Sequence, residues 1–197
     1  MILTGMDFRR RLFQYRSYTP IPFLIVMLMF AHPTLRSLLI GLCVVCAGEF
    51  LRLWGVAIAG SETRTTGSVG GTFLITTGPF AHVRNPLYLG NILLYFGIGL
   101  MSNALMPWLP WIALLYFFVQ YTLIVSLEEE YLIRTFGSDY AKYCEAVPRF
   151  VPVFKKYVSG THEQPALSWK RGVVSEKRSL QAIGLLTLVL IAFWQLR

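Results

Sequence analysis

The chain has 197 residues, of which 55% are hydrophobic and only 14% are charged. Soluble domains carry about 25% charged residues, and a soluble fold of this size cannot bury so much apolar surface. A soluble globular domain is therefore excluded, and lipid is the expected solvent. The formal charge of +8 calls for an anionic partner, either nucleic acid or a membrane surface.

Five apolar runs are candidate membrane helices, because a hydrocarbon core of roughly 30 Å requires about 20 helical residues. In chain order they are Ile21 to Ala31, Ser37 to Ala59, Leu87 to Met101, Ala104 to Ser126 and Ser179 to Leu196. The second and fourth are long enough to span alone, whereas the first and third need help from flanking residues or neighbouring helices. We expect an all-α polytopic membrane protein with about five transmembrane helices and a cytoplasmic cofactor pocket. The first run also resembles a signal peptide, but no convincing cleavage site follows it, so we expect a retained helix.

The basic residues gather in the segments that five spans place on one side, together with the N-terminus. With that side inside, only Arg36 and Arg197 lie outside, and the loop from Ser102 to Pro107 has no charge. Lys and Arg favour cytoplasmic loops. We therefore expect an integral protein of a bacterial inner (cytoplasmic) membrane, with its N-terminus and active site in the cytoplasm. This asymmetry accounts for the charge without nucleic acid, and the basic stretch before the last run suits anionic lipid headgroups.

The chain divides into a membrane domain over residues 1–160, a cytoplasmic linker over 161–178 and a C-terminal transmembrane helix over 179–197. No internal repeat is visible, which disfavours a transporter built from inverted halves. Cys43 and Cys46 form a CxxC inside an apolar run without a second ligand pair, so packing is favoured over zinc binding. No metal site is expected.

One polar constellation precedes the third run, in the stretch TTGPFAHVRNPLYLGN from Thr76 to Asn91. Asn85 and Pro86 are typical of a helix start, with Asn as the N-cap and Pro at the first position. The unpaired N–H groups of such a start favour a carboxylate or phosphate, and Arg84 adds a bidentate partner. The alternative is a capped helix with Arg84 anchored among headgroups.

A second constellation follows the fourth run, in EEEYLIRTFGSDYAKY from Glu128 to Tyr143, and closes with VPRFVP. Carboxylates at a helix C-terminus oppose the helix dipole unless something positive binds there. Gly137 and Ser138 are expected to stop one helix and cap the next, with this part lying along the membrane surface. A solvated acidic collar is the alternative interpretation.

Together these segments offer anion-binding and cation-binding groups. A ligand that carries a carboxylate, an amino group and a further positive centre suits them, and S-adenosylmethionine has all three. Here GPFAHVRNPLY, followed by EEEYLIRTFGSDYAKYCEAVPRFVP, resembles the isoprenylcysteine carboxyl methyltransferase and phospholipid methyltransferase superfamily of integral membrane enzymes. Its members show GPYxxVRHPxYxG and then a Glu-Glu pair leading into LxxxFGxxYxxYxxxVPRxxP. The resemblance covers roughly Leu51 to Pro152.

The resemblance implies an S-adenosylmethionine site, with catalytic roles for Arg84 and Glu129. The residues implied to bind the cofactor are His82, Arg84, Asn85, Pro86, Leu87, Tyr88, Glu128, Glu129, Tyr140 and Tyr143, and Arg149 is implied to line the same region toward the substrate. Which two of the three glutamates form the pair is left open. Asn85 stands where the family has His and cannot titrate near neutrality, so a proton-accepting role passes to His82 or is absent.

Glu49 and Arg52 lie one helical turn apart inside the second run. Charges within a membrane are costly and rarely face lipid, so these two form either a structural bridge between helices or a contact to a substrate headgroup. The expected activity is methyl transfer to a lipophilic acceptor from the bilayer, either isoprenylcysteine carboxylate-like or phospholipid amine-like. The alternatives are an NADPH-dependent sterol-type reductase and a noncatalytic membrane scaffold. The oligomeric state is not predicted.

Overall fold

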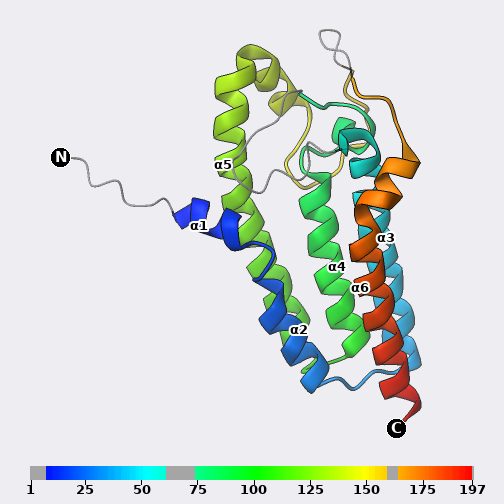
Figure 1. Ribbon diagram of the computed structural model, residues 1–197. Coiled ribbons are helices and arrows are strands. Elements are labelled where there is room, and N and C mark those ends of the chain that lie inside the picture. Colours follow the sequence, from blue (N-terminus) through cyan, green and yellow to red (C-terminus); the bar gives the residue numbers. More distant parts are fainter. Residues whose placement is uncertain (1–7, 61–73, 159–163, 197) are drawn as a thin grey trace, which may run out of the picture.

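The computed structural model describes residues 8–60, 74–158 and 164–196, and the regular secondary structure of these residues is entirely helical, with no strand. Figure 1 shows a bundle of long helices with one end capped by loops and short turns. The elements are α1 (Phe8–Tyr15), α2 (Pro20–Met29), α3 (Leu35–Ala59), the 3-10 turn η2 (Gly78–Ala81), α4 (Pro86–Ser102), α5 (Trp108–Ala146) and α6 (Trp169–Gln195). The all-α prediction is confirmed.

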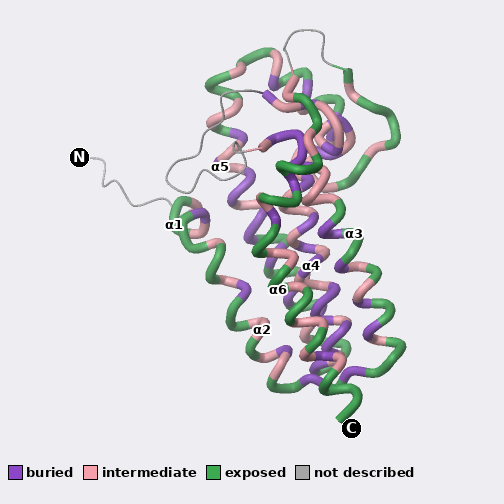
Figure 2. Tube along the Cα trace, turned by 45° about the vertical axis from the view of Figure 1, so that its right-hand side comes forward, coloured by how far each residue is buried: buried purple, intermediate pink, exposed green. Residues whose placement is uncertain are grey.

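Three described helices, α3, α5 and α6, are long and apolar enough to cross a bilayer. The shorter apolar helices α2 and α4 coincide with the first and third predicted runs. The chain is thus an integral membrane protein by helix length, composition and family, while the count of five spans stays a prediction. The main core lies between the helices, as the purple segments of Figure 2 indicate, and Phe117 at its centre is fully buried.

Helices α3 and α4 form the closest contact in the bundle, because glycines let their backbones approach. A Cβ atom built on Gly48 would lie 2.8 Å from the carbonyl oxygen of Gly90, and one built on Gly97 would lie 2.9 Å from that of Gly41. Small residues at helix interfaces are the usual route to close packing in membranes. At its first turn, α3 is closed by a reciprocal capping box between Thr34 and Ser37.

Helix α5 continues past the predicted boundary at Ser126 and reaches Ala146. The stop predicted at Gly137 appears as a break within this helix, since Gly137 has φ 52° and ψ −122°. The part after the break packs through a small second core of Leu74, Tyr140, Tyr143 and Val147. The break therefore redirects the end of α5 across one end of the bundle, as Figure 1 shows at the top.

Helix α6 begins at Trp169, well before the Ser179 that begins the last apolar run, so the second half of the predicted linker is helical. Ser168 caps this start, and its N–H donates to the carbonyl of Ala57 at 2.9 Å. Gly172 seats α6 on α3, because a Cβ there would lie 3.0 Å from the carbonyl oxygen of Leu53. Residues 161–163 of that linker lie outside the described residues.

Candidate functional site

The three consecutive glutamates of α5 face three different neighbours. Glu128 accepts a hydrogen bond at 2.7 Å, Glu129 an ion pair at 3.0 Å and Glu130 an ion pair at 2.5 Å. Their partners are, in that order, Tyr88 of α4, Arg84 before α4 and Arg9 of α1. Because successive helical residues point about 100° apart, three adjacent carboxylates cannot face one ligand equally. Glu128 and Glu129 therefore lie toward α4 and the segment before it, whereas Glu130 lies toward α1.

Glu129 lies between two guanidinium groups. Besides Arg84, it accepts hydrogen bonds from Arg149, whose Nε lies 2.9 Å and whose Nη2 lies 2.5 Å from Glu129 Oε2. The Glu129 side chain is 8% exposed, and this hydrogen bond raises the pKa of Arg149 above its ordinary value. The site therefore holds one buried carboxylate flanked by two fixed positive charges.

Arg84 holds the segment before α4 against the end of α5. Its Nη1 donates to the carbonyls of Cys144 at 2.8 Å and Val147 at 3.0 Å, and its backbone N–H donates to the carbonyl of Pro148 at 2.9 Å. The Nε atom is buried and has no hydrogen-bond partner in the described part of the chain. Arg84 Nε is thus a buried donor that the described residues leave unsatisfied.

Further hydrogen bonds join the same two segments. His82 Nδ1 lies 2.8 Å from the carbonyl oxygen of Val153, and the Tyr143 hydroxyl donates to the carbonyl of Phe80 at 2.6 Å. Asn85 occupies the predicted N-cap position of α4 but makes no side-chain cap; its Nδ2 donates instead to the carbonyl of Arg149 at 3.3 Å. The helix start predicted at Asn85 and Pro86 is thus confirmed, whereas capping by the Asn85 side chain is not seen, and its amide is turned toward the facing loop instead.

The remaining predicted residues occupy distinct places. Tyr88 packs on Tyr121 with ring centroids 4.8 Å apart and directs its hydroxyl to Glu128. Leu87 packs toward α3, since a Cβ on Gly55 would lie 2.9 Å from Leu87 Cδ2. Pro86 and Tyr140 are buried, the first at the start of α4 and the second in the small core near the Glu129 cluster. Tyr140 thus lies beside the site and Leu87 faces away from it.

Glu49 and Arg52 form a separate layer deeper in the bundle. Arg52 Nη2 lies 2.5 Å from Glu176 of α6, and Arg52 Nη1 donates to Asn91 of α4. Arg52 therefore bridges three helices, which is the structural alternative weighed from the sequence. Sequence reasoning missed Asn91 and Glu176; the available signal for Glu176 is a single acidic residue among basic ones, just before an apolar run.

The residues around Glu129 fit S-adenosylmethionine by charge. The buried unpartnered Nε of Arg84 and the half-exposed side chain of Arg149 suit a carboxylate. Glu128, which accepts a hydrogen bond from Tyr88 among the described residues, suits an ammonium or sulfonium. Both signs of charge therefore meet where α4 begins, as the ligand requires.

The structure is thus a helical bundle with a cluster of carboxylates and arginines at one end. The chain belongs to the phospholipid methyltransferase family, whose model matches residues 37–139. That range includes nearly all of α3, the whole of α4 and the glutamate triad, but ends before the last turns of α5 and before α6. Arg149 and Glu176 thus lie beyond the matched range.

Curated relatives are distant. The chain is 28% identical over 148 residues to the cobalt-zinc-cadmium resistance protein CzcN of Cupriavidus metallidurans, covering 70% of this chain and 62% of that one. It is 30% identical to the nickel-cobalt-cadmium resistance protein NccN of Alcaligenes xylosoxydans xylosoxydans, covering 58% and 49%. It is 31% identical to protein-S-isoprenylcysteine O-methyltransferase of Schizosaccharomyces pombe, covering 55% and 47%. The chain thus spans from about half to three fifths of these proteins, and no solved structure matches it.

Proposed function

We propose that this protein transfers a methyl group from S-adenosylmethionine to a lipophilic acceptor that arrives through the bilayer. The observation that carries the proposal is the Glu129 carboxylate held by Arg84 and Arg149 beside the Glu128–Tyr88 pair. Membership of the phospholipid methyltransferase family supports the reaction class, as does the name of the fission yeast relative. The acceptor is a carboxylate such as that of an isoprenylcysteine, or the amine of a phospholipid.

The cofactor supplies a methyl group on a positively charged sulfur and needs no metal. Arg84 and Arg149 would hold its carboxylate, while Glu128 and Glu129 would hold its positive groups. Tyr88 orients Glu128 through the 2.7 Å hydrogen bond from its hydroxyl. Fixed alignment of the reacting groups supplies much of the acceleration in such a displacement. The role of this chain is therefore to bind, orient and exclude water.

We place this site on the cytoplasmic side of a bacterial inner membrane, with five helices crossing the bilayer. The basic residues at the site's end of the bundle support this orientation.

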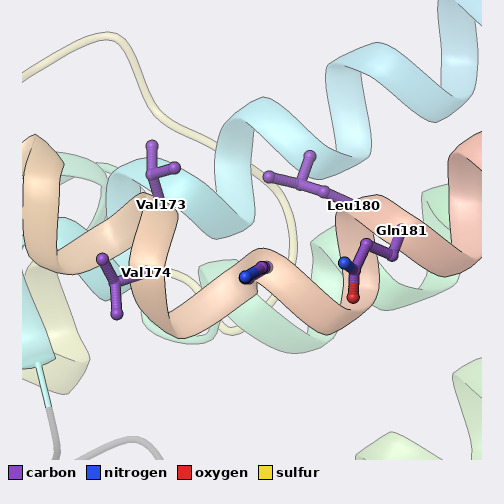
Figure 3. A pocket seen from close by; sticks show the side chains of 5 residues that line it. Val173, Val174, Leu180 and Gln181 are labelled. Atoms are coloured by element: carbon purple, nitrogen blue, oxygen red, sulfur yellow. The ribbon is translucent and has the colours of Figure 1, made fainter.

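The first turns of α6 add a contact for membrane lipid. An open groove there is lined by Val173, Val174, Lys177, Leu180 and Gln181 (Figure 3). Its apolar floor suits an acyl chain and Lys177 suits a headgroup phosphate.

Calorimetric titration of the detergent-purified protein with S-adenosylhomocysteine tests the proposal, with NADPH as the parallel ligand. Saturable binding of the first alone supports the methyltransferase, binding of NADPH indicates a reductase, and binding of neither indicates a scaffold. Glu128→Gln should weaken S-adenosylhomocysteine by about tenfold, since a charge-assisted hydrogen bond is lost. Glu130→Gln is the matched control, because the adjacent carboxylate pairs with Arg9 instead, and its affinity should stay unchanged.

A further inference from the structure

The 150–158 segment, which follows directly after Arg149, carries an exposed apolar surface. Val151, Phe154 and Val158 are 71%, 103% and 79% exposed. Single apolar side chains are common on protein surfaces, but a cluster of them marks a surface that contacts a partner or a membrane. The two lysines that follow Phe154, at positions 155 and 156, are exposed as well. The segment therefore presents apolar and cationic groups together.

The opposite side of the 150–158 segment is fixed to the cap of the candidate site. The N–H of Val153 donates to the carbonyl of His82 at 2.9 Å, and the N–H of Tyr157 donates to the carbonyl of Ala81 at 3.0 Å. The Tyr157 ring also packs on that of Tyr143, with ring centroids 5.3 Å apart. One side of the segment thus holds η2 and the end of α5, and its exposed side chains lie on the other.

The start of the segment lies at the depth of a membrane-crossing helix. Phe150 packs on Phe118 of α5, with ring centroids 5.6 Å apart. Phe118 precedes Ser126, the end of the fourth apolar run, by about two helical turns, and it is 46% exposed on the surface of α5. Because α5 is apolar and long enough to cross the bilayer, this contact places Val151 at the edge of the lipid rather than in bulk water.

The rest of the segment lies at the level where α4 begins. Its backbone bonds reach Ala81 and His82, which precede the start of α4 at Pro86 by only a few residues. No acidic residue occurs in the sequence between Glu145 and Glu163, so no neighbour in the chain offsets the charge of the two lysines. Apolar side chains that enter the acyl boundary, with lysines beside them, suit the surface of an anionic bilayer.

We propose that the 150–158 segment is an interfacial anchor, which inserts its exposed apolar side chains between lipid headgroups and binds anionic phospholipids through Lys155 and Lys156. The inference goes beyond the proposed function and does not depend on it. The same stretch of chain carries Arg149, which pairs with Glu129, and Val153, which holds His82. Contact with anionic lipid therefore fixes the cap of the candidate site to the bilayer surface.

Photocrosslinking of the full-length protein tests the anchor. The photoreactive residue p-benzoylphenylalanine replaces Phe154, and the protein is placed in nanodiscs of equal parts phosphatidylcholine and phosphatidylglycerol. Mass spectrometry identifies the adduct. We expect lipid adducts in which phosphatidylglycerol is enriched about fivefold, because a lysine near an anionic surface contributes about that factor. The control position is Ser138, which is exposed beside the break in α5 at the far end of the bundle and should give few lipid adducts (Figure 1).

Charge variants that carry the same photoreactive residue test the two lysines. Lys155→Gln with Lys156→Gln should return the phosphatidylglycerol share of the adducts to that of the nanodisc. Arg134→Gln with Lys142→Gln removes two positive charges from exposed positions of α5 and should keep the enrichment. The inference is overturned by lipid adducts as rare as those at Ser138, by crosslinks to a second copy of the chain, by adducts without enrichment, or by enrichment that survives loss of both lysines.

Hydrogen exchange of the wild-type protein gives a second test that needs neither a variant nor a cofactor. Peptides that cover residues 150–158 should exchange more slowly in nanodiscs that contain phosphatidylglycerol than in nanodiscs of phosphatidylcholine alone, because the bound segment keeps the N–H groups of Val153 and Tyr157 on their acceptors. High salt should remove the difference by screening the lysines. Equal exchange in the two nanodiscs at low salt overturns the inference, whatever the protein does with S-adenosylhomocysteine.

Discussion

Arg84 Nη2 lies 3.0 Å from Glu129 Oε1, and this ion pair joins the segment before α4 to the middle of α5. Both side chains are about nine-tenths buried, with 10% and 8% of their surfaces exposed. The pair connects two motifs that are far apart in the sequence. Its removal should therefore affect stability as well as binding.

Glu129→Gln should lower the free energy of unfolding by about 3 kcal/mol, because the change leaves the buried Arg84 guanidinium without its countercharge. Denaturant titration in detergent, followed by circular dichroism, measures this loss. Glu130→Gln should change the same quantity by less than about 1 kcal/mol, since the Glu130 side chain is 46% exposed. Similar losses in both variants would show that the Arg84–Glu129 pair contributes little.

Tyr143→Phe should release the segment around η2 from the end of α5. The variant keeps the ring but loses the 2.6 Å hydrogen bond from the Tyr143 hydroxyl to the carbonyl of Phe80, at a cost of about 1 kcal/mol. Amide hydrogen exchange of residues 80–85 should accelerate. Tyr116→Phe is the control, because the Tyr116 side chain lies on the exposed side of α5, and unchanged exchange in both variants would contradict the role of Tyr143.

Gly137→Ala should destabilise the protein by about 1–3 kcal/mol through backbone strain alone. A Cβ at Gly137 meets nothing within 4 Å, but its φ of 52° is unfavourable for other residues. Gly184→Ala provides the matched control, because its Cβ also meets nothing and its backbone is helical. Thermal unfolding should show a loss for the first variant and none for the second; equal midpoints would mean that the break in α5 relaxes without cost.

Gly48→Ala should separate α3 from α4 and cost about 1–3 kcal/mol, because the added methyl group meets the rigid carbonyl of Gly90 at 2.8 Å. Gly55→Ala on the same helix should cost less, since its methyl group meets the movable side chain of Leu87 at 2.9 Å. Unfolding midpoints of the two variants make the comparison. A larger loss for Gly55→Ala would place the tightest contact elsewhere.

The helices follow from the sequence because hydropathy acts locally, whereas the matched family range begins and ends earlier than the expected Leu51 to Pro152. The runs that became α3 and α4 match their predicted bounds within two residues at each end, and Gly137 marks the break in α5 as its residue type predicts. The motif from Arg84 to Tyr88 and the pair Glu128 and Glu129 are local patterns in the same sense. Membership of the family could therefore be predicted without coordinates.

Tertiary structure alone decided which charges meet. The periodicity of the sequence cannot show that Glu129 forms ion pairs with two arginines while Glu130 pairs with Arg9. These partners come from segments that are distant in the sequence. Glu176 was missed for the same reason. The sequence places it in a polar linker, whereas the packing of α6 against α3 brings it to Arg52. Hydropathy determines which residues enter the bilayer, whereas pairing inside it depends on helix packing. Only packing showed that none of the described residues donates a hydrogen bond to Glu49.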